Sequence, residues 1–84
     1  MEEYMSSNLK QDISIGKQLK LFRKKANLTQ DQVAAQLTIM GYTITSDIIA
    51  KMEQGKYSIK ISILLALKDI YQIESFDEIF ADLI

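Results

Sequence analysis

The sequence predicts an all-α fold, a compact domain of five short helices. Proline is absent from the 84 residues and glycine occurs only at positions 16, 41 and 55, so helices can run with few breaks. Apolar residues recur at helical spacing in five segments, and helix-capping residues separate these segments. We expect one domain over residues 13–84, preceded by a flexible segment over residues 1–12, which has no clear apolar period.

The first helix is predicted over residues 14–26. Four apolar residues at i, i+4, i+7 and i+11 form one stripe with lysines on the other side, namely Ile15, Leu19, Phe22 and Ala26. Asn27 tolerates the left-handed backbone conformation that commonly ends a helix, so we expect the helix to stop there.

The second helix is predicted to begin after Thr29. Thr29 and Gln32 have the spacing of a capping box, in which each residue satisfies a free backbone N–H group of the first turn. Its expected buried face consists of Val33, Ala34 and Leu37. We expect the helix to continue to about Met40 and to stop at Gly41.

The third helix is predicted to be short. Thr45 or Ser46 supplies its N-cap, and Ile49 and Met52 at i, i+3 supply its buried face. Gly55 has the position of the glycine that commonly follows a helix C-terminus.

Two helices are predicted in the acidic C-terminal part. We expect Ser58 to cap the fourth, with Ile61, Leu64, Leu65 and Tyr71 facing inward. Ser75 and Glu78 form a second capping box that opens a final short helix. The apolar residues of this last segment are Phe76, Ile79, Phe80, Leu83 and Ile84. They are expected either to form a homodimer contact or to close the core of the monomer.

Composition argues against several classes of function. The chain has no cysteine and no histidine, which excludes disulfides, ordinary zinc sites and nucleophiles activated by an imidazole. We therefore expect no enzyme, no metal and no cofactor. The apolar runs are far shorter than the roughly 20 residues of a membrane span, and the acidic N-terminus does not resemble a secretory signal. A cytoplasmic location without membrane association is the expectation.

The net charge of −1 hides an uneven distribution. Residues 13–60 contain eight basic and three acidic side chains, whereas residues 1–12 have a net charge of −2 and residues 61–84 one of −4. A basic middle between acidic ends is typical of a surface that binds an anionic partner. A well-solvated helical face explains the same charges equally well.

Short motifs occur in a fixed order along residues 15–55. They are Ile15 with Gly16, Leu19 through Arg23, Leu28 through Gln30, Val33 with Ala34, Leu37, Ile49, Met52 with Glu53, and Gly55. In this order and spacing they resemble the Cro and lambda-repressor type of helix-turn-helix, the XRE-like family. The resemblance covers about residues 13–80. It implies a lambda-repressor-like domain in which residues 29–55 form the helix-turn-helix of a transcriptional regulator, a repressor that binds double-stranded DNA as a homodimer.

The resemblance also implies roles for individual residues. Gln30 would bind a backbone phosphate at the start of the second helix. Four residues of the third helix, Ser46, Asp47, Ala50 and Lys51, would lie near base edges in the major groove. The DNA backbone is expected near Thr43, Thr45, Lys56, Tyr57 and Lys60. Arg23 and Glu53 would form a structural ion pair between the first and third helices rather than contact DNA.

Two features leave alternatives open. Asp47 can accept a hydrogen bond from cytosine N4, or it can act as a first-turn acid that stabilises the helix dipole. Seven residues, 38–44, separate Leu37 from Thr45, which predicts a longer connection than compact members of the family have and places Tyr42 either near DNA or over the core. Two rival functions share this fold: a protein-interaction module that does not bind DNA, and an antitoxin-like protein that binds both DNA and a toxin through its C-terminal helix.

Overall fold

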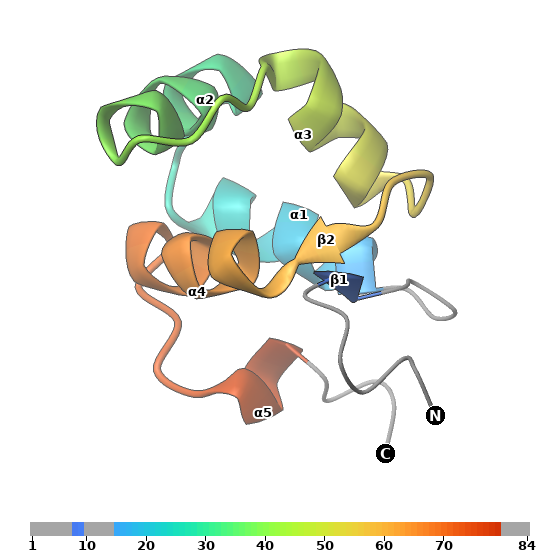
Figure 1. Ribbon diagram of the computed structural model, residues 1–84. Helices are drawn as coiled ribbons and strands as arrows, with labels where there is room; N and C mark the ends of the chain where they lie inside the picture. Colours follow the sequence, from blue (N-terminus) through green and yellow to red (C-terminus); the bar gives the residue numbers. More distant parts are fainter. Residues whose placement is uncertain (1–7, 10–14, 80–84) are drawn as a thin grey trace.

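A computed structural model describes residues 8–9 and 15–79 as a mostly helical domain (Figure 1). The elements run in the order β1 (Asn8–Leu9), α1 (Ile15–Lys25), α2 (Gln30–Ile39), α3 (Ser46–Glu53), β2 (Ile59–Lys60), α4 (Ile61–Ile70) and α5 (Phe76–Ile79). In Figure 1, α1 lies between α3 above and α5 below, and it contacts both. None of the described helices is long and apolar enough to cross a membrane.

The core draws side chains from every helix. Fourteen apolar side chains within the described residues are buried, and they form one cluster: Ile15, Leu19, Val33, Leu37, Ile49, Met52, Ile59, Ile63, Leu64, Ala66, Leu67, Tyr71, Ile73 and Ile79. Phe22, Ala26 and Leu28 are half-buried against this cluster. The predicted apolar faces of the first three helices therefore face the core, with Ala34 half-buried at the edge of its face.

The first turn of α1 lies directly against the end of α3. A Cβ atom added to Gly16 would overlap the carbonyl oxygen of Met52 and would lie 2.8 Å from that of Glu53. Only glycine permits two backbones to come this close. Gly16 thus fixes the distance between α1 and the C-terminus of α3.

The ends of α1, α2 and α3 agree with the predicted capping signals. Asn27 has a φ of 59° after α1, and Thr29 and Gln32 form the complete capping box of α2. Gly41 and Gly55 follow α2 and α3 with φ values of 98° and 76°. At each glycine two backbone N–H groups bond back to the last helical turn, as in a Schellman motif. These four predictions are confirmed.

The fourth helix differs from the prediction in both its start and its buried face. Ser58 does not cap it, because residues 59–60 form strand β2, which pairs antiparallel with β1 and leads into α4 after Lys60. Ile61 and Leu65, expected in the core, are 46% and 51% exposed. Leu64 and Tyr71 are buried as predicted.

The composition of residues 59–67 explains why the start and the buried face of α4 differ from the prediction. Ile59 is completely buried, which places the extended residues just before α4 in the core. With Ile59 in the core and α4 starting only at Ile61, the side of α4 that faces inward consists of Ile63, Leu64, Ala66 and Leu67. Since nearly every residue from 61 to 67 is apolar, the sequence does not reveal which side of the helix faces inward.

The C-terminal helix is only partly described. The Glu78 carboxylate accepts hydrogen bonds from the backbone N–H groups of Glu74 and Ser75, which is the Glu78 half of the predicted capping box. Ile79 is buried and so contributes to closing the monomer core. Phe80, Leu83 and Ile84 lie outside the described residues. Of the predicted flexible segment, 1–12, the structure describes only β1, a strand that the sequence did not suggest.

Candidate nucleic-acid interface

Helices α2 and α3 form one compact unit at the top of the molecule (Figure 1). Residues 40–45 connect them, and Val33, Leu37, Ile49 and Met52 bury their inner faces in the common core. The Thr45 hydroxyl caps α3 by accepting a hydrogen bond from the backbone N–H of Ile48 at 3.3 Å. Helix α3 is thus held through its inner face and its two ends, and its outer side is open to solvent.

The outer side of α3 carries the residues that were predicted to lie near bases. Asp47 and Lys51 are exposed, whereas Ser46 and Ala50 are half-buried. Lys51 Nζ lies 3.2 Å from an oxygen of Asp47, one helical turn away. Asp47 therefore serves within the chain as a first-turn acid and as the partner of Lys51, which agrees with its structural interpretation. The pair leaves this part of α3 without net charge.

Positive charge lies instead just beyond the C-terminus of α3. Lys56, Tyr57, Ser58 and Lys60 line an open hollow of about 340 Å³. All four residues are exposed, and the two lysines have no acidic residue beside them in the lining. The structure thus brings together Lys56, Tyr57 and Lys60, three of the residues predicted to contact phosphates.

The longer α2–α3 connection divides its residues between core and solvent. Tyr42 is half-buried and packs against the core, whereas Thr43 is exposed. Of the two interpretations of Tyr42, cover of the core agrees with this position. Ile39, the last residue of α2, and Met40, the first residue of the connection, are 85% and 46% exposed.

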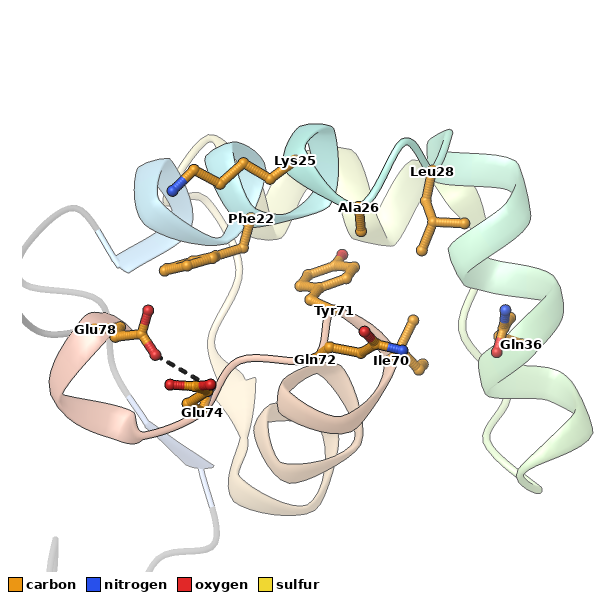
Figure 2. Close-up of a pocket in the computed structure, with 10 residues that line it drawn as sticks. All are labelled: Phe22, Lys25, Ala26, Leu28, Gln36, Ile70, Tyr71, Gln72, Glu74 and Glu78. Carbon is orange, nitrogen blue, oxygen red and sulfur yellow. Dashed lines mark hydrogen bonds between the residues drawn. The ribbon is translucent and has the colours of Figure 1, made fainter.

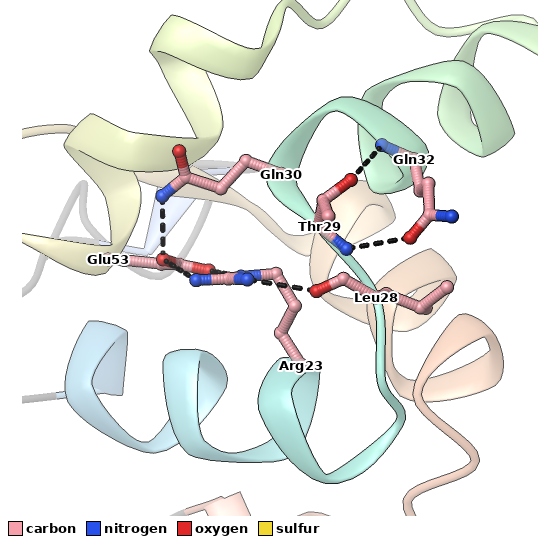
Figure 3. Close-up of polar contacts among 6 residues, drawn as sticks. All are labelled: Arg23, Leu28, Thr29, Gln30, Gln32 and Glu53. Carbon is pink, nitrogen blue, oxygen red and sulfur yellow. Dashed lines mark hydrogen bonds and ion pairs between the residues drawn. The ribbon is translucent and has the colours of Figure 1, made fainter.

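A hydrogen-bonded cluster holds the other end of α3 (Figure 3). Arg23 Nε donates to Glu53 Oε2 at 2.7 Å and a second guanidinium nitrogen donates to Oε1 at 3.1 Å, so the pair is bidentate. The third nitrogen donates to the carbonyl oxygen of Leu28 at 2.9 Å. Arg23 is only 7% exposed. The hydrogen bonds to Glu53 raise the pKa of Arg23 above its usual value against the opposing effect of burial.

Gln30 joins the same cluster. Its side-chain amide nitrogen donates to Glu53 Oε1 at 3.0 Å (Figure 3). Gln30, predicted as a phosphate ligand, therefore also ties the first turn of α2 to the end of α3. The sequence contained no signal for this contact, because Gln30 and Glu53 are 23 residues apart and meet only through the packing of α2 against α3. We call Arg23, Gln30 and Glu53 the clamp.

Comparison with known proteins identified no relative: no family model, no curated protein and no solved structure matches the chain. The resemblance to the XRE-like family accordingly rests on the motifs between residues 15 and 55. Among the residues that the structure describes, no group of three or more acidic side chains is placed to hold a metal ion.

Proposed function

We propose that this chain is a sequence-specific, double-stranded-DNA-binding transcriptional regulator of the repressor type, with α3 as the helix that enters the major groove. The observation that supports the proposal most is the presentation of α3. The clamp and Gly16 fix one end, Thr45 caps the other, and the outer side remains unpacked beside a hollow lined by two lysines. An α-helix presented in this way fits the width of the major groove.

Base contacts are proposed for the exposed side of α3. Lys51 suits the O6 and N7 acceptors of guanine, and it would exchange its contact with Asp47 for one with the base. Ser46 and Ala50, half-buried on the same helix, would bring a hydroxyl and a methyl group to a base edge. The Asp47–Lys51 pair would make this recognition depend on the base, because Lys51 stays bound to Asp47 where the base offers it no acceptor.

Backbone contacts are proposed around α3. Lys56, Tyr57 and Lys60 would hold a phosphate in their hollow, and Thr43 and Thr45 would contact the strand that passes the start of α3. At the first turn of α2, Gln30 would offer a phosphate its second amide hydrogen while the first stays on Glu53. In a homodimer, two such surfaces would bind half-sites about 34 Å apart.

Fluorescence anisotropy with labelled DNA tests the proposal. The DNA set includes fragments flanking the chain's own gene and unrelated fragments, each measured at two salt concentrations. We expect affinity to fall steeply with salt, and Lys56→Ala to lower the slope of log K against log salt by about 0.9. Lys51→Ala should reduce the preference for the specific fragment. Lys25→Ala removes an equal charge from α1, at a side chain that lines a pocket without any residue of α3, and should change neither quantity.

The absence of binding to every fragment at low salt would contradict the proposal. A protein-interaction module is then the second candidate, and the Asp47–Lys51 pair favours it because the pair removes net charge from the middle of α3. Asp47→Asn separates the two candidates. In a DNA-binding protein it should strengthen binding by freeing Lys51, whereas in a protein-interaction module it should leave the chain without affinity for DNA.

A further inference from the structure

We propose that a pocket between α1, α4 and α5 is a binding site for an amphipathic organic cation, a small molecule with an ammonium or guanidinium group on an aromatic or aliphatic body. The pocket has a volume of about 510 Å³. Small-molecule sites in proteins generally measure about 300–1,000 Å³. The pocket is separate from the proposed DNA-binding surface, because none of the residues proposed to contact DNA lines it. We call it the α1–α5 pocket.

Part of the wall of the α1–α5 pocket is apolar. Phe22, Leu28 and Ile70 are half-buried and Tyr71 is buried, and these four come from α1, the α1–α2 connection and the end of α4. Figure 2 shows the ring of Tyr71 in the middle of the drawn residues and the ring of Phe22 nearer to Glu78. This wall provides a surface for the apolar body of a ligand, with affinity that rises with the apolar area covered.

The rim supplies polar groups at opposite ends. The carboxylates of Glu74 and Glu78 lie at one end, and the Gln36 amide lies at the other (Figure 2). Glu78 is held in place because its carboxylate accepts two backbone hydrogen bonds. A ligand with a cationic group at one end, and a group that can hydrogen-bond at the other, matches this arrangement.

The sign of the ligand's charge follows from the surrounding charges. Residues 69–79 contain Asp69, Glu74, Asp77 and Glu78 and no basic side chain, so the α4–α5 side of the pocket repels anions. Lys25 is the one basic residue in the lining, and its ammonium group lies 5.4 Å from the centre of the Phe22 ring. Because Lys25 already lies over this ring, the ammonium group of a ligand would bind toward Glu74 and Glu78 rather than on Phe22.

A titration of the complete chain followed by two-dimensional amide NMR tests the inference. The probe is phenethylammonium at pH 7, with 2-phenylethanol and 3-phenylpropanoate as neutral and anionic controls of similar size. We expect saturable shifts of amide signals around Phe22, Tyr71 and Glu74 with the ammonium probe, weaker binding of the alcohol and the weakest binding of the carboxylate. Equal affinity for the ammonium and the alcohol would overturn the assignment of a cation. Shifts that omit the pocket would overturn the site.

Two variants with the same change of charge sharpen the test. Glu74→Gln removes a carboxylate of the rim without altering the backbone bond that helps to cap α5, and should weaken phenethylammonium binding about threefold. Asp77→Asn removes a carboxylate of α5 that does not line the pocket, and should leave the affinity unchanged. An equal loss in both variants would overturn the proposal, because it would reflect overall charge rather than a site. The amide spectrum of each variant also reports whether its fold is intact.

Discussion

The first three helices and the C-terminal part of the chain differ in how their structure is encoded. In residues 15–55, polar capping residues mark the helix ends, and the apolar residues of α1 and α3 recur at a spacing that defines one face. In residues 59–70, apolar residues are nearly continuous, and the buried face of α4 depends on where β2 places its start. Local signals therefore specify the proposed DNA-binding unit, whereas tertiary contacts specify the structure of residues 59–70, which pack beneath it.

The largest effect is expected from breaking the clamp, which joins the locally specified helices. Arg23→Ala leaves the Glu53 carboxylate buried beside Gln30 without its cation, and should lower the free energy of unfolding by about 3–5 kcal/mol. Urea denaturation followed by circular dichroism measures the loss. Arg23→Met combined with Glu53→Leu removes both charges and should recover a large part of it. Equal stability of wild type and Arg23→Ala would show that the pair does not hold α3.

A second pair of variants tests the assignment of the buried face of α4. Ile63→Ala should cost about 2–4 kcal/mol of unfolding free energy because Ile63 is only 2% exposed, whereas Ile61→Ala should change it by less than about 0.5 kcal/mol. Both variants remove the same atoms from the same helix, so their difference reports burial alone. The reverse order in denaturation experiments would restore the inward face that the sequence suggested.

The sequence alone predicts the helix ends of this protein better than its long-range contacts. Thr29, Gly41, Thr45 and Gly55 are predictable because each solves a local backbone problem at a helix end. The ion pair of Arg23 and Glu53 is a resemblance-based prediction that the structure shows as a bidentate contact. The bond between Gln30 and Glu53, the pairing of β1 with β2 and the α1–α5 pocket were not predictable, because each depends on residues far apart in the sequence.

Gly16 tests the close approach of α1 to α3. Gly16→Ala places a Cβ against two backbone carbonyl oxygens that cannot rotate away, and should cost about 1–3 kcal/mol of unfolding free energy. Gly41→Ala is an informative control, since it meets no steric overlap and loses only the ease of adopting a φ of 98°. Thermal unfolding compares the two. A larger loss at Gly41 would mean that α1 and α3 tolerate greater separation than the structure indicates.

The smallest stability effect is expected from Tyr71 and appears only at alkaline pH. Burial raises the pKa of Tyr71 well above its usual value of 10.0, so the unfolded chain releases the phenolic proton at lower pH than the folded chain does. The folded state then holds more protons above about pH 10, and stability falls as pH rises, by up to about 1.4 kcal/mol per pH unit. Tyr71→Phe should remove this part of the alkaline loss. Parallel stability–pH curves for the two proteins above pH 10 would contradict the prediction.

The central claim is that α3 reads DNA sequence. Selection of bound fragments from a random double-stranded DNA pool tests it most directly, with the wild-type chain and Lys51→Ala compared at the same salt concentration. We predict that the wild type enriches one motif, repeated as a palindrome if the chain binds as a dimer, and that Lys51→Ala loses the preference at one or two positions of each half-site. A selected pool that does not differ from the starting pool would contradict the claim.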